Sequence, residues 1–158
     1  MTLADIVQQK LAETTPQSAR HELAIAADGS GWSLSLTLDR RDELGCLVWE
    51  LTLHRTTPAP ADETLRSWAD RVTQQATGLL EHLKVLEIDP ERNEAMLRSE
   101  TPSKRKDKCS YYELLLRGTR TALLRRFQAN IDGTGKREQI AFALTNDGLA
   151  KLANDLTR

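Results

Sequence analysis

The chain has 158 residues, of which 39% are hydrophobic and 28% are charged, a composition that excludes a disordered or fibrous protein and is typical of one folded domain. No apolar run approaches the roughly 20 residues of a membrane-spanning helix, so we expect no membrane span. Residues 1–100 contain 10 Lys or Arg against 17 Asp or Glu, a net charge of −7, whereas residues 101–158 contain 12 against 6, a net charge of +6. Such asymmetry can mark a surface that meets a charged partner.

The first residues have neither the basic segment nor the apolar stretch of a secretory signal peptide. Cys46 and Cys109 lie far apart in sequence, and two cysteines in a leaderless chain favour free thiols over a disulfide. We therefore expect a protein of the reducing cytoplasm.

The N-terminal residues predict one helix followed by three strands. Apolar residues at helical spacing predict a helix over residues 3–12, capped by Thr2. The period then changes to two, which predicts strands at 23–27 and 32–39 with Asp28-Gly29-Ser30-Gly31 as a tight turn between them. In the second strand we expect Trp32, Leu34, Leu36 and Leu38 to face the core, and in the third Leu47, Trp49, Leu51 and Leu53.

A long helix is predicted from about Ala61 to about Leu83, after the strand-breaking segment 56–60. One narrow apolar stripe steps by three or four residues along it and should lie on the sheet: Leu65, Trp68, Val72, Ala76, Leu79 and Leu83. We expect the opposite face, with Arg66, Asp70, Gln74 and Glu81, to meet solvent.

The remainder is predicted to be mostly strands, followed by a last helix. The predicted strands cover residues 85–88, 94–99, 111–117, 120–129 and 138–144, and a polar basic loop covers 101–108. Asn146 or Asp147 is expected to cap the final helix.

These elements predict a single α+β domain over residues 1–158. Its antiparallel sheet has about 7–8 strands in the order α-βββ-α-βββββ-α, with the long central helix packed on one face. In element order alone, the opening helix, three strands and helix resemble small cytoplasmic secretion chaperones, which implies a chaperone-like binding module. The strands after Asp89 depart from that order.

Motifs for catalysis or metal binding are not evident in the sequence. His21, His54 and His82 are isolated, whereas a zinc site needs clustered ligands. The Ser30 turn lies between two predicted strands, whereas a nucleophile elbow joins a strand to a helix. The glycine loop at 132–136 lacks the spacing of a phosphate-binding loop. We therefore predict no catalytic residue, no metal and no cofactor.

The basic C-terminal residues form the best candidate site for an anion or a partner, with Tyr111 and Tyr112 close enough in sequence to stack on bases. The candidate binding residues are Lys104, Arg105, Lys106, Lys108, Arg117, Arg120, Lys136 and Arg137. Nucleic acid is the less favoured ligand, because the pI of about 6.3 is far below the values above 9 that are usual for nucleic-acid-binding domains.

Arg125 has two interpretations. It shares a strand face with Leu123 and Phe127, and the adjacent Arg126 must point the other way. If the Arg125 face is the core side, the charge needs a partner such as Glu113. If that face is exposed, Phe127 is an apolar part of a binding surface.

The favoured function is a non-enzymatic binding or accessory module that meets another protein or a second copy of itself through a sheet edge. One alternative is an anion or nucleic-acid binder that uses the basic C-terminal half. A second alternative is an enzyme with dispersed active-site residues.

Overall fold

The computed structural model describes residues 1–27 and 29–158, and its first four elements follow the predicted order. Helix α1 (Leu3–Glu13) begins with a capping box, in which the Thr2 hydroxyl accepts from the Asp5 amide at 3.1 Å and the Asp5 carboxylate accepts from the Thr2 amide at 2.9 Å. Strands β1 (His21–Ala27), β2 (Trp32–Arg41) and β3 (Gly45–Arg55) follow. The predicted turn after β1 includes Asp28, which lies outside the described residues.

The predicted core face of β2 is confirmed, but half of that of β3 is wrong. Leu51 and Leu53 are buried as expected, whereas Leu47 and Trp49 are only partly buried and Val48 takes the core position. In the β2–β3 register Thr37 pairs with Glu50 and Leu38 with Val48, so Trp49 is the extra residue of a β-bulge. A one-residue bulge exchanges the two faces of all residues beyond it.

The predicted long central helix is also wrong in its extent. Helix α2 (Leu65–Gln75) begins at a Thr64–Ser67 capping box and ends before Thr77 and Gly78, which are poor helix formers. Residues 76–82 form an irregular segment. The apolar stripe is buried as far as the helix reaches, from Leu65 to Ala76, whereas Leu83 is buried as part of the next strand.

The second half contains more strands than predicted. They are β4 (Leu83–Asp89), β5 (Glu94–Ser99), β6 (Ser103–Arg105), β7 (Lys108–Arg117), β8 (Thr121–Asn130), β9 (Glu138–Ile140) and β10 (Phe142–Thr145), and helix α3 (Asn146–Thr157) ends the chain. The expected basic loop 101–108 folds as the β6–β7 hairpin, and the expected last strand is divided at Ala141. The N-cap of α3 is Thr145, whose hydroxyl accepts from the Gly148 amide at 2.9 Å.

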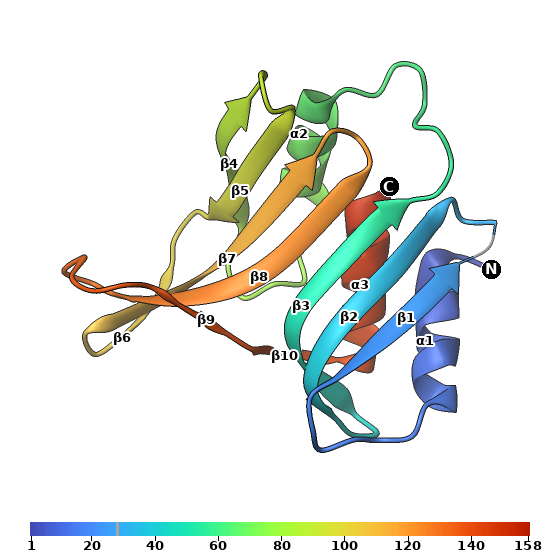
Figure 1. Cartoon of the computed structure of the whole chain (residues 1–158), viewed down its shortest axis with the longest axis horizontal. Coiled ribbons are helices and arrows are strands. Elements are labelled where there is room, and N and C mark those ends of the chain that lie inside the picture. Colours follow the sequence, from blue (N-terminus) through green and yellow to red (C-terminus); the bar gives the residue numbers. More distant parts are fainter. Residues whose placement is uncertain (28) are drawn as a thin grey trace.

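The ten strands form one antiparallel sheet with the main order β1-β2-β3-β8-β7-β5-β4, which confirms the predicted α+β class. Strands β3 and β8 pair only over Leu51–His54 and Thr121–Leu124. Beyond this the two strands diverge, and the β9–β10 segment lies between them (Figure 1). Strand β9 pairs with β8, and β10 pairs with β3.

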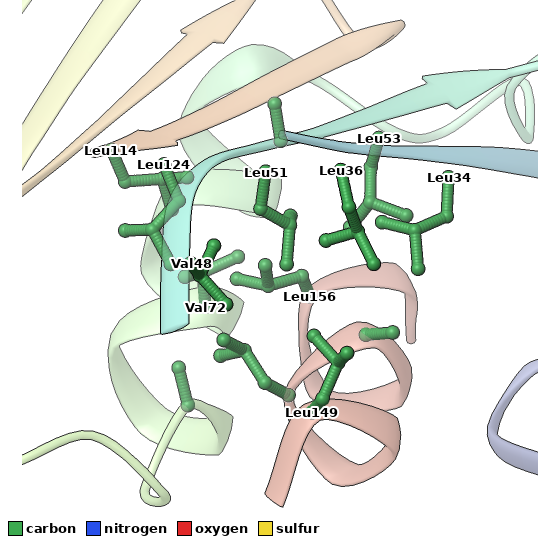
Figure 2. Close-up of a cluster of buried hydrophobic side chains, with 14 of the residues drawn as sticks. Leu34, Leu36, Val48, Leu51, Leu53, Val72, Leu114, Leu124, Leu149 and Leu156 are labelled. Atoms are coloured by element: carbon green, nitrogen blue, oxygen red, sulfur yellow. The ribbon is translucent and has the colours of Figure 1, made fainter. Parts of the chain in front are cut away.

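All three helices cover one face of the sheet, with α3 between α1 and α2 (Figure 1). Figure 2 shows Leu51 and Leu53 of β3 pointing from the sheet toward Val72 of α2 and Leu149 of α3. The opposite sheet face, which we call the outer face, carries no helix formed by residues 1–27 or 29–158. Among the described residues, no helix is long and apolar enough to cross a membrane.

Candidate functional site on the outer face

The predicted basic residues do not converge on one surface. Arg117 and Arg120 flank the turn between β7 and β8, and Arg117 pairs with Glu94 at 3.8 Å. Lys108 begins β7, so about 30 Å of extended strand separates it from Arg117. Seven of the eight candidates are therefore divided between the two ends of the β7–β8 hairpin.

Five of the candidates belong to the end formed by β6 and the β8–β9 loop, which lie side by side (Figure 1). They are Lys104, Arg105, Lys106, Lys108 and Lys136, and all five are exposed. The two segments are joined by a hydrogen bond from the Ile131 amide to the Asp107 carbonyl at 2.8 Å. A hollow of about 390 Å³ between them is lined by Asp107 and Asp132 as well as by Lys106, so its walls carry both signs of charge.

The eighth candidate, Arg137, reaches a buried carboxylate in the middle of the outer face. Glu113 of β7 is only 3% exposed and lies directly between Arg98 of β5 and Arg125 of β8 in the strand register. Arg98 donates to Glu113 at 2.9 Å, and Arg137 donates to the same carboxylate oxygen. We call Arg98, Arg125 and Arg137 around Glu113 the arginine cluster.

Two aromatic rings support the arginine cluster. Tyr111 and Phe127 face each other across β7 and β8, with ring centroids 6.2 Å apart. The Arg98 guanidinium lies 4.9 Å from the Tyr111 centroid, and the Arg137 guanidinium lies 3.8 Å from the Phe127 centroid. Both rings are more than nine-tenths buried, so these cation–π contacts hold the guanidinium groups and leave little ring surface for a base to stack on.

Electrostatics at the cluster favour the charged state of Arg137. Burial alone would lower the pKa of the Arg137 guanidinium, but its hydrogen bonds to Tyr111 and Glu113 outweigh burial and raise that pKa above its usual value. Three guanidinium groups surround one carboxylate, so the cluster carries an excess of two positive charges. Arg98 and Arg137 keep 36% and 40% of their side chains exposed and are the members that a ligand can reach.

The surroundings of the cluster are apolar. Met96, Leu115 and Leu123 lie in register on β5, β7 and β8, one outer-face position along from the cluster, and each is partly exposed. Arginine, tyrosine and methionine are enriched in protein–protein interfaces. The outer face therefore combines reachable positive charge with neighbouring apolar surface.

The structure takes one part from each interpretation of Arg125. Its face is the outer face, as in the second interpretation, but Phe127 is buried there. Glu113, the partner named in the first interpretation, lies opposite Arg125, although the ion pairs of Glu113 are with Arg98 and Arg137. Arg126 is the arginine that points to the helix side, where it is buried against Glu81 with contacts of 2.8 and 3.0 Å. The expectation that Glu81 meets solvent is wrong, because this residue lies beyond the end of α2.

Burial alone would raise the pKa of Glu81, but Arg126 and the hydroxyls of Ser103 and Ser99 outweigh burial and hold that pKa below its usual value. Burial also raises the pKa of Tyr112, whose ring lies 4.1 Å from the Arg126 guanidinium. This closed pair joins segment 76–82 to the sheet and has no access to a ligand.

A second hollow, of about 830 Å³, lies where the β2–β3 turn, β10 and residues 16–18 meet. Arg41, which lines this hollow, donates hydrogen bonds to the carbonyls of Leu11 and Thr14 at the end of α1. Cys46 is buried there, and burial raises the pKa of its thiol to about 11, so the thiol stays protonated at neutral pH. The hollow thus offers no thiolate for nucleophilic chemistry.

The sequence alone did not identify Arg98 as a site residue and did not connect Arg137 to Glu113. The signal for Arg98 is a cross-strand register, because Arg98, Glu113 and Arg125 align only when β5, β7 and β8 are paired. Comparison with protein-family models, with curated proteins and with solved structures gives no match to this chain.

Proposed function

We propose that the protein is a non-enzymatic accessory module whose outer face binds an acidic, partly apolar segment of another protein. The observation that carries this proposal is the arginine cluster on a sheet face that no helix covers. Its excess of two positive charges complements carboxylates, which guanidinium groups bind in a planar, two-pronged geometry.

The cluster is suited to binding because its arginines are held in place before a ligand arrives. The Glu113 carboxylate accepts hydrogen bonds from Arg98 and Arg137. The rings of Tyr111 and Phe127 make cation–π contacts with the same two guanidinium groups. A guanidinium has five N–H donors, so donors remain for a ligand after these contacts. Preorganised side chains lose less conformational entropy on binding.

The neighbouring row of Met96, Leu115 and Leu123 supports an apolar component in the ligand. An extended segment with Glu and Leu two residues apart presents a carboxylate to the cluster and an apolar side chain to the row on the same face. Nucleic acid is less favoured, because the cluster's rings are covered and the remaining basic residues are divided between two distant ends.

The test is fluorescence anisotropy with three labelled probes: a short peptide with Glu and Leu two residues apart (the Glu-Leu peptide), its Lys-Leu counterpart and oligo(dT). We expect the protein to bind the Glu-Leu peptide alone, and salt to weaken that binding. Arg98→Gln and Arg137→Gln should each weaken it roughly tenfold, the effect of losing one charge-assisted hydrogen bond.

Arg120→Gln is the matched control, because Arg120 is exposed and lies at the far end of the β7–β8 hairpin. It removes the same charge and should leave affinity unchanged, and circular dichroism confirms that each variant is folded. The proposal would be overturned if all three variants weakened binding equally, or if the protein did not bind the Glu-Leu peptide. Binding of oligo(dT) instead would favour the nucleic-acid alternative.

A further inference from the structure

The sheet is open, and its two edge strands differ in how well they resist pairing with another chain. Strand β4 is one edge and carries a bulge, because the register with β5 shifts between Val85 and Glu87. Lys84 and Glu87 add charges to the same strand. Bulges and charged side chains are the usual features that block edge-to-edge association.

Strand β1 is the other edge, and it has no bulge and only one acidic side chain. Its seven residues pair with β2 in one unbroken register, from His21 with Leu38 to Ala27 with Trp32. It contains no Pro, Lys or Arg, and Glu22 is its one acidic residue. Within the described residues β1 pairs with β2 alone, so the hydrogen-bonding groups on its other side are unpaired by any strand.

We infer that two copies of the chain associate by pairing β1 with β1 in an antiparallel fashion, about a two-fold axis through Ala24. This register uses all seven residues of the strand. It places Leu23 opposite Ile25 of the other copy on the core side, so apolar residues continue across the junction.

The outer side of the junction is compatible with the same register. Glu22 falls opposite Ala26 of the other copy, so no like charges meet, and the two Ala24 side chains meet at the axis. Ala24 and Ala26 are small and exposed. The two sheets become one continuous sheet, with both outer faces on the same side. This inference rests on the edge strand alone and does not depend on the proposed function.

Sedimentation velocity of the whole chain over a range of concentrations tests the inference. We expect a concentration-dependent dimer of the unmodified chain. Ala24→Lys and Ala24→Glu should each give monomers, because like charges then meet at the two-fold axis, and an equimolar mixture of the two variants should dimerise again. Restoration in the mixture distinguishes pairing through residue 24 from a folding defect.

Ser35→Lys is the matched control. Ser35 is the exposed neighbour of Ala24 on β2, so the same charge is added one strand away from the junction. This variant should remain dimeric. A monomer at all concentrations for the unmodified chain, or a dimer of Ala24→Lys as stable as that of the unmodified chain, would overturn the inference.

Discussion

Replacing Arg126 with Leu should be among the most destabilising single changes in this fold. Glu81 is buried and accepts two contacts from Arg126 and one each from Ser99 and Ser103, at 2.8 and 2.7 Å. Arg126→Leu leaves that carboxylate buried with two hydroxyl donors and no counter-charge. Breaking a buried ion pair in this way costs about 3–5 kcal/mol of the free energy of unfolding.

The pH dependence of this loss has a definite sign. In the unmodified protein the pKa of Glu81 is held below its usual value of 4.5, so its contribution to stability is present above pH 4.5 and is lost as the pH falls through the lowered pKa. Without Arg126, burial dominates and the pKa of Glu81 should lie above 4.5. The variant therefore gains stability on acidification, and the difference between the two proteins shrinks.

Thermal and urea unfolding at pH 7 and at about pH 4.5 measure this prediction. At pH 7 we expect the melting temperature of Arg126→Leu to fall by roughly 6–20 °C, given about 2–4 °C per kcal/mol for a domain of this size. Adding Glu81→Gln removes the buried charge and should recover part of the loss. A loss of less than about 1 kcal/mol that is the same at both pH values would show that Arg126 does not compensate the buried charge of Glu81.

Two further predictions concern the core. Val72→Asp should unfold the protein, because it places an unpaired carboxylate in a fully buried position at a cost comparable to the whole stability of about 5–15 kcal/mol. Gln74→Asp, on the exposed side of α2, is the control. An unchanged melting temperature of Val72→Asp would contradict the packing of α2. With a thiol-specific disulfide reagent at pH 8, Cys46 should react far more slowly than the half-buried Cys109, because Cys46 is 5% exposed and its thiol pKa is about 11. Equal reaction rates of the two thiols in the folded protein would contradict this prediction.

The sequence predicted the fold class because its strands have one face on the core. The alternation over Trp32–Leu38 requires only local information, and the structure confirms that face. The two main errors, in β3 and at the end of α2, depend on contacts between elements as well as on local sequence. The bulge at Trp49 shows only in the pairing of β3 with β2, and Glu81 leaves the helical pattern where Arg126, 45 residues later, pairs with it.

The candidate site was only partly predictable for the same reason. Composition located an excess of positive charge in the C-terminal third, and the spacing of Arg125, Phe127 and Glu113 indicated that they could meet. The contribution of Arg98 depends on the pairing of β5 with β7, and that of Arg137 on the path of the β8–β9 loop back along β8. The sequence shows how many basic residues the chain contains, whereas strand register decides which of their side chains lie together.

Amide chemical-shift mapping with the Glu-Leu peptide decides whether the outer face around Glu113 is the surface that binds it. We expect the largest shifts on β5, β7 and β8 around Arg98, Glu113 and Phe127, and Arg137→Gln should reduce them at the same peptide concentration, in line with roughly tenfold weaker binding. Shifts confined to the β6–β7 hairpin at Lys104–Lys108, or to the helices, would contradict it.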